Sequence, residues 1–323
     1  MGNTKKKSEN NFIVQGGILV IAGFISRFIG MIYRIPMTNA LGDKGLAYYE
    51  NAYVIYNLAL IISSYGLPMA VSRMVAAKNA KKEYKNAYKL FKASLIFATI
   101  SGGVMALFIF IFAKYLSIHI YKTPYCMIPL KILAPTIFLC AIMGVIRGYF
   151  QGNGNMVPTA VSQLIEQIIN AIVSVVATLT FMKYAKKESF YAICDSKESW
   201  GAGGGTLGTF IGAIFGLLTL IIIFMLNRRK INYSLKSDTT NNESNKAIYK
   251  IMLLTILPII LAQTLYNLNS IVDRSLFSHL SSYSKDIRED YLGRFGKYYL
   301  LVNIPIAVAT ALGNSVLPVI VKE

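Results

Sequence analysis

The stretch FIVQGGILVIAGFISRFIGMIYR, residues 12–34, decides the fold class of this chain. It is long and apolar enough to cross a lipid bilayer as one helix, which takes about 20 residues. Its two charged residues, Arg27 and Arg34, would lie on one helix face about two turns apart. An arginine at membrane depth costs roughly 2.5–3.5 kcal/mol, so it normally faces a bundle interior or a water-filled cavity. The pair therefore predicts a binding site for an anionic ligand.

Similar apolar stretches recur along the whole chain. Hydrophobic residues make up 54% of it and charged residues only 15%, and the mean hydropathy is +0.49, which no soluble domain shows. We therefore predict an all-α polytopic membrane protein. The expected membrane-spanning helices lie at residues 12–33, 48–69, 93–116, 127–150, 157–182, 207–226, 251–276 and 298–320. The second and the seventh are the most polar and are expected to face the bundle interior.

The net charge of +18 reflects membrane orientation better than nucleic-acid binding. The basic residues fall mainly between the spans, and they form no stripe interleaved with aromatic residues, so no nucleic-acid partner is expected. Basic segments at residues 5–7, 78–89 and 228–236 share one side of the predicted topology. The positive-inside rule therefore predicts a cytoplasmic N-terminus. Residues 183–200 and 285–297 are also basic on the other side, but acidic neighbours accompany them.

The chain carries no motif for covalent chemistry. It has no HExxH, Walker or GxSxG motif and no acidic pair placed for acid–base catalysis. The cysteines Cys126, Cys140 and Cys194 are odd in number and lack metal-ligand spacing. His119 and His279 lie near predicted helix ends. We therefore expect no enzyme, no metal site and no organic cofactor.

A glycine-rich segment at residues 201–208 opens the sixth predicted span. Neither a preceding strand nor a GK[ST] sequence accompanies it, so it does not match a phosphate-binding loop. We interpret it as a flexible turn that leads into a closely packed helix, continued by Gly212 and Gly216 at small-xxx-small spacing.

The chain also contains an internal echo. The sequence GLPMAV at residues 66–71 is similar to VLPVIV at residues 316–321, and at nearly the same offset the charged end of the first span is matched by Asp273 and Arg274. This pattern favours a repeat that begins again late in the chain. The predicted organisation is a cytoplasmic tail at residues 1–11, a six-helix lobe at 12–226, a cytoplasmic linker at 227–250 and the start of a second lobe, with two helices, at 251–323.

Four motifs in order carry a resemblance to a known family. They are ISRFIGMIYR at residues 25–34, GDKGL at 42–46, GLPMAVSR at 66–73 and RGYFQGNGNMVPTA at 147–160. Together they resemble the group of polysaccharide-lipid flippases around stage V sporulation protein B and MurJ, in the multidrug/oligosaccharidyl-lipid/polysaccharide (MOP) superfamily. The similarity runs from about residue 12 to 320. The resemblance implies a bundle of two six-helix lobes, of which this chain would cover the first lobe and two helices of the second.

The resemblance also implies a function, namely alternating-access flipping of a lipid-linked cell-wall or polysaccharide precursor across the bacterial cytoplasmic membrane. The expected partners are this lipid-linked oligosaccharide and membrane lipids, with cell-wall synthesis proteins as further candidates. By similarity, Arg27, Arg34 and Arg73 would contact the head group and the pyrophosphate, which suits the bidentate fork of arginine. The alternatives are snorkelling of Arg27 and Arg34 toward an interface, and an orientation anchor for Arg73.

Four other polar residues are candidates for a cavity, a gate or ion coupling. Gln163 and Glu166 share one helix face, which favours either a cavity lining or a hydrogen-bonded network between helices. Arg147 lies at the cytoplasmic end of the fourth span, as an anchor or as a gate contact across the cytoplasmic mouth. An intramembrane carboxylate can bind Na⁺ or H⁺, so Asp273 is the candidate for coupling to an ion gradient or the membrane potential, with Arg274 as a competing ion-pair partner.

Two rival functions remain at this stage. A cation-coupled multidrug exporter of the same fold would have cationic substrates, which an arginine-lined helix repels. A membrane-embedded glycan polymerase or ligase would need a large outer loop with a catalytic cluster, and the outer segments here are short.

Overall fold

The computed structural model describes residues 2–64, 66–185, 196–240, 243–298 and 302. Within these ranges all regular structure is helical, and the strand content is nil. The elements are α1 (Gly2–Ser64), α2 (Leu67–Ala80), α3 (Tyr84–Tyr121), the short helix η1 (Pro124–Cys126), α4 (Met127–Gly152), α5 (Val157–Tyr184), α7 (Lys197–Ser237) and α8 (Asn245–Leu280). Residues 285–298 are also helical. The prediction of an all-α protein is confirmed.

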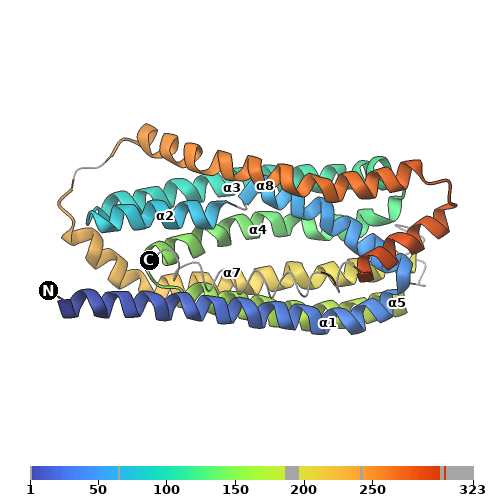
Figure 1. Ribbon diagram of the computed structural model, residues 1–323, viewed down its shortest axis with the longest axis horizontal. Coiled ribbons are helices and arrows are strands. Elements are labelled where there is room, and N and C mark those ends of the chain that lie inside the picture. Colours follow the sequence, from blue (N-terminus) through green and yellow to red (C-terminus); the bar gives the residue numbers. More distant parts are fainter. Residues whose placement is uncertain (1, 65, 186–195, 241–242, 299–301, 303–323) are drawn as a thin grey trace.

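α1 contains two helices joined at Gly42. This glycine has φ 66° and ψ −174°, a backbone conformation that glycine adopts without steric cost. Figure 1 shows α1 running along one side of the bundle and then turning back across it. The first predicted span and most of the second therefore lie in α1, and the loop expected between them, at residues 34–47, is reduced to a break at one residue. The second predicted span is itself interrupted, because α1 ends at Ser64 and α2 begins at Leu67.

Six helical stretches of the described chain are long and apolar enough to cross a membrane. The first, Gln15–Ala80, has 66 residues, about three times the length that one crossing needs, and it holds the first two predicted spans. The other five correspond to the third to seventh predicted spans. The eighth, at residues 298–320, lies almost wholly outside the described residues, as does the second copy of the repeat at 316–321.

The glycine-rich segment at residues 201–208 is part of α7, so the interpretation as a flexible turn is wrong. The helix begins earlier than expected, at Lys197, where the Ser196 side chain caps it by accepting a hydrogen bond from the Ser199 N–H. The glycines are buried. α5 approaches Gly201, Gly204 and Gly208, whereas Gly203 faces α4 and Gly205 faces α1. α7 continues to Ser237 and α8 starts at Asn245, so the predicted linker at 227–250 is mainly helical.

Close packing between α5 and α7 makes a testable prediction at Gly204. A Cβ atom there would lie 2.6 Å from the carbonyl carbon and oxygen of Ala177, which are backbone atoms and cannot rotate away. We expect Gly204→Ala to destabilise the protein by about 1–3 kcal/mol through overpacking. The measurement is the melting temperature of purified protein in detergent. Gly103→Ala is the matched control, because a Cβ there would meet only the Phe138 ring, at 3.7 Å. Equal melting temperatures for the two variants would contradict the prediction.

The helices form a bundle with two distinct ends. The turns at residues 81–83 and 153–156 and the described residues between α7 and α8, 238–240 and 243–244, lie at the end where the chain begins, which we call the N-terminal end. The turns at residues 122–126 and 281–284 lie at the opposite end (Figure 1). Gly42 belongs to this end because its neighbour Asp43 packs against Gly293, and we call it the Gly42 end.

Candidate functional site

The arginines of α1 lie beside the face that packs on α5. A Cβ at Gly30 would lie 3.1 Å from Nε2 of Gln167, and the Asn170 amide donates a hydrogen bond of 3.4 Å to the Tyr33 hydroxyl. Arg27 is exposed and Arg34 is partly buried. The helical spacing places both on one flank of α1, as the sequence indicates.

Arg34 has an acidic partner that the sequence analysis missed. Its guanidinium Nη1 lies 3.6 Å from Oε1 of Glu50, and its Cζ lies 5.9 Å from the centre of the Tyr49 ring. Glu50 is only 8% exposed, so the ion pair lies within the bundle. Arg34 and Glu50 are each eight residues from Gly42, and this symmetry about a tight turn is the signal in the sequence that could have revealed the pair.

Arg147 and Glu166, which the sequence analysis treated separately, form one pair. Nη2 of Arg147 lies 2.7 Å from Oε2 of Glu166, and its Nε donates a hydrogen bond of 3.0 Å to the Ser162 hydroxyl. Gln163 lies nearby in sequence, and its buried Oε1 has no hydrogen-bond partner within the described ranges. The pair joins α4 to α5 close to the turn between them.

The pairing predicts that removing one partner destabilises the protein. Glu166→Ala leaves the partly buried Arg147 without its counter-charge. We expect the free energy of unfolding to fall by roughly 1–3 kcal/mol, which lies between the losses found for exposed and for buried ion pairs. Thermal unfolding in detergent measures it. The control Lys197→Ala removes an exposed pair with Glu198 at 3.8 Å and should have almost no effect. A loss no larger than that of Lys197→Ala would contradict the prediction.

The remaining candidates are dispersed over other helices. Arg73 is exposed on α2, and Asp273 is exposed on α8. Arg274 is buried and donates a hydrogen bond of 2.8 Å to Oδ1 of Asn51. Among the described residues no ion pair joins Arg274 to Asp273, so the carboxylate is not held by the neighbour that was expected to compete for it.

At the Gly42 end, residues 43–51 of α1 pack against residues 274–297. Lys44 Nζ lies 2.6 Å from Oδ1 of Asp286, and this ammonium holds the pKa of the Asp286 carboxyl below its usual range. The Tyr48 hydroxyl donates a hydrogen bond of 2.5 Å to the buried Oε2 of Glu289. We call these contacts the Gly42-end clamp.

Three contacts of Asp43 complete the clamp. Asp43 lies 2.5 Å from the ammonium of Lys297 and 3.6 Å from the guanidinium of Arg294. Gly293 lies so close to the Asp43 backbone that a Cβ atom would not fit. The clamp thus joins residues about 240 positions apart in the sequence. In the described ranges, no group of three or more His, Cys, Asp or Glu side chains is placed to hold a metal ion.

The chain is similar to bacterial membrane proteins over nearly its whole length. It is 28% identical to the lipid II flippase MurJ of Bacillus subtilis over 95% of this chain and 57% of that protein. It is 27% identical to stage V sporulation protein B of the same organism, over 67% of this chain and 40% of that protein. The chain thus spans about half the length of the curated relatives it matches.

Solved structures share the fold. A MOP superfamily transporter from Pyrococcus furiosus superposes with a TM-score of 0.64 at 16% identity, over 94% of this chain and 63% of that one. An outward-facing multidrug resistance transporter of the MATE family superposes with a TM-score of 0.64 at 13% identity, over the same fractions of the two chains. The proteins whose names state an activity are a flippase and transporters, not enzymes. The profile of the polysaccharide biosynthesis protein family matches residues 13–323, so this multi-pass membrane chain with a MOP-type helical fold belongs to that family.

Proposed function

We propose that the protein is a flippase for a lipid-linked cell-wall or polysaccharide precursor, an undecaprenyl-pyrophosphate-linked glycan such as lipid II. The observation that carries the proposal is the placement of Arg27 and Arg34 on one flank of α1 in a chain whose family includes a lipid II flippase. We place the protein in the bacterial cytoplasmic membrane with its N-terminus in the cytoplasm, because the N-terminal end of the bundle carries the basic segments.

The chemistry of the substrate suits these arginines. A pyrophosphate presents paired oxygens that a guanidinium binds through two parallel hydrogen bonds. Arg34 already faces Glu50, so an arriving pyrophosphate would compete with this carboxylate and share the charge of Arg34. Arg27 and Arg73 are exposed and would supply further contacts. The partial neutralisation by Glu50 keeps the site from holding a dianion too tightly to release it.

Alternating access assigns a role to the Gly42-end clamp. A flippase must open each end of its path in turn, and the contacts of Lys44, Tyr48 and Asp43 with residues 286–297 close one end. We therefore assign this structure to a state closed at the Gly42 end, which is the outer end in the proposed orientation. The exposed carboxylate of Asp273 is our candidate for binding Na⁺ or H⁺ as the end opens.

A multidrug exporter of the same fold is the second candidate, because the MATE family shares the architecture. The cationic flank of α1 argues against cationic drugs as substrates, since like charges raise the cost of binding. Measured transport of the two substrate classes separates the candidates.

The test is flipping by the purified protein in liposomes. A fluorescent lipid II and a fluorescent cationic drug are offered to the same vesicles, and the fraction of lipid II that reaches the opposite leaflet is read by quenching from outside. We expect lipid II to cross and the drug to be excluded. Drug uptake without lipid II movement would favour the exporter, and movement of neither would contradict the flippase proposal.

A further inference from the structure

A small cavity with polar and apolar lining residues lies at the N-terminal end of the bundle, away from the arginines of α1. It has a volume of about 140 Å³ and is formed by the ends of α2, α3, α4 and α7. That space exceeds the roughly 10–15 Å³ needed for one water and is smaller than a pocket for a drug-sized ligand. Its polar lining comprises Asn79, Tyr84, Asn153, Asn155, Asn227, Lys230 and Ser234. The cavity therefore suits a small polar group.

Hydrogen bonds fix part of this lining in place. The Asn153 amide donates a hydrogen bond of 2.7 Å to the Tyr149 carbonyl, and its Oδ1 accepts one of 3.0 Å from Asn79. The Gly152–Asn155 turn presents these amides, with Gly154 at φ 76°. This turn is a part of the RGYFQGNGNMVPTA motif to which the proposed flipping gives no role.

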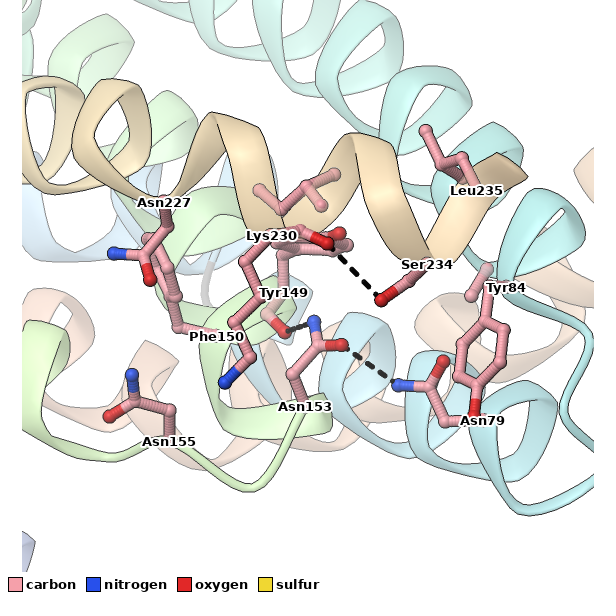
Figure 2. A pocket seen from close by; sticks show the side chains of 12 residues that line it. Asn79, Tyr84, Tyr149, Phe150, Asn153, Asn155, Asn227, Lys230, Ser234 and Leu235 are labelled. Atoms are coloured by element: carbon pink, nitrogen blue, oxygen red, sulfur yellow. Dashed lines mark hydrogen bonds between the residues drawn. The ribbon is translucent and has the colours of Figure 1, made fainter. Parts of the chain in front are cut away.

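Three donors of the lining have no protein acceptor in the described part of the chain: the Lys230 ammonium, the Asn155 amide nitrogen and the Tyr84 hydroxyl. Figure 2 shows the Lys230 side chain extending down from α7 so that its ammonium lies between Asn155 and Asn153. A cation, an amide donor and a hydroxyl that line one cavity favour an anion with several oxygens.

Neighbouring acidic residues do not satisfy this charge, because each of them is already bonded elsewhere. Glu83 and Glu243 both pair with Lys78. Asp238 accepts hydrogen bonds from the Lys85 N–H and from Thr240, and these lower the pKa of its carboxyl to about 2. The cavity thus keeps the positive charge of Lys230.

The position of the cavity along α7 favours the head-group layer of a membrane. Met225 and Leu226 are exposed apolar side chains, and Asn227 and Lys230 of the cavity follow directly. At 1.5 Å per residue, Lys230 lies about 6 Å beyond Leu226. The layer of head groups on each side of the hydrocarbon core is about as thick as that.

We infer that this cavity binds a phosphate ester that carries free hydroxyl groups, with Lys230 on the phosphate and the asparagine amides on the hydroxyls. Phosphate esters of this kind occur as the head group of an anionic phospholipid and as soluble molecules such as glycerol phosphate. Basic pockets between membrane helices commonly hold anionic head groups. The site is distinct from the proposed pyrophosphate contacts, since Arg27, Arg34 and Arg73 are not among its lining residues.

The experiment measures binding of two probes to the purified full chain in detergent: phosphatidylglycerol by native mass spectrometry, and glycerol 1-phosphate by calorimetry. We expect Lys230→Gln to weaken binding of the recognised probe about fivefold and Lys230→Arg to retain it. Lys236→Gln is the matched control, because Lys236 is an exposed cation of the same helix that does not line the cavity. We expect it to bind as the wild type does.

The two probes and the two lysine variants distinguish the possible outcomes. Lys230-dependent binding of phosphatidylglycerol alone identifies a lipid head group, and Lys230-dependent binding of glycerol 1-phosphate identifies a soluble phosphate ester; both support the inference. Equal weakening by Lys230→Gln and Lys236→Gln would show general attraction to a basic surface and would overturn it. Absence of binding by both probes would overturn it as well. Neither reading depends on flipping, so the inference can fail while the proposed function stands.

Discussion

Replacing Arg34 with alanine is expected to lower flipping of lipid II by about 10- to 100-fold. A hydrogen bond to a charged group contributes about 1.5–3 kcal/mol, and each 1.4 kcal/mol corresponds to a factor of ten in rate. Arg27→Ala should have a similar effect, because both guanidinium groups lie on the same flank of α1. The measurement is the initial flipping rate in liposomes, divided by the amount of folded protein.

Arg34 also has a structural role, and the design must separate the two. Arg34→Ala leaves the buried Glu50 without its counter-charge, which destabilises the protein whatever the substrate. Arg34→Lys keeps the charge beside Glu50 but loses the bidentate fork. This variant should therefore be as stable as the wild type but should still flip lipid II slowly. As a control, Arg229→Ala removes an exposed cation near the C-terminal end of α7. This variant is expected to flip lipid II at the rate of the wild type.

Wild-type flipping rates in these variants would contradict the assignment of Arg27 and Arg34 as pyrophosphate contacts. If Arg34→Lys and Arg27→Ala are folded and flip lipid II at the rate of the wild type, the arginines only stabilise the bundle or snorkel. Their proposed contact with pyrophosphate would then be wrong.

In the described part of the chain, the apolar stretches predicted the long helices correctly but not their ends, and they did not predict α2 as a separate helix. Length and hydropathy identify a membrane helix because the bilayer demands an unbroken hydrogen-bonded backbone. Length and hydropathy do not predict the length of the connection between two helices. At Gly42, one residue with positive φ replaces the loop that was expected between the first two spans. α7 likewise extends eleven residues past the predicted end at Leu226. These residues are mostly polar, so hydropathy does not include them in the span, although they continue the helix.

The glycine-rich segment at residues 201–208 shows why composition alone can mislead. Glycine weakens an isolated helix by about 1 kcal/mol per residue, and this propensity favoured a flexible turn. In the bundle the same glycines allow α5 and α7 to approach closely, as at Gly204 against Ala177, and helix packing outweighs propensity. The correct signal was the small-residue spacing that continues to Gly212 and Gly216.

The candidate site was only partly predictable. The shared flank of Arg27 and Arg34 follows from helical periodicity. Glu50, the partner of Arg34, follows the break at Gly42 in α1, and Glu289, the partner of Tyr48, follows α8, so both contacts depend on how the chain folds back. Pairs placed symmetrically about a tight turn, such as Arg34 with Glu50, are within the reach of sequence reasoning. The contacts between Tyr48 and Glu289, 241 positions apart, are not.

Crosslinking the Gly42-end clamp is expected to stop flipping completely and reversibly. In a variant without native cysteines, Lys44→Cys and Asp286→Cys place thiols where the wild type has an ion pair of 2.6 Å. A short, reducible reagent that joins two thiols then holds residues 43–50 against 274–297. If flipping requires this end to open, the rate falls to that of empty liposomes and returns after reduction.

The matched control carries the same chemistry at the N-terminal end. Lys78 and Glu83 form an ion pair of 3.0 Å between α2 and the start of α3, and these neighbouring segments of the same lobe need not separate during transport. Crosslinked Lys78→Cys/Glu83→Cys protein should therefore flip at the uncrosslinked rate, and each single cysteine should be unaffected by the reagent. Full activity of crosslinked Lys44→Cys/Asp286→Cys protein would show that the Gly42 end stays closed throughout transport. The clamp would then be a permanent structural contact, and the substrate would have to leave the protein by another route.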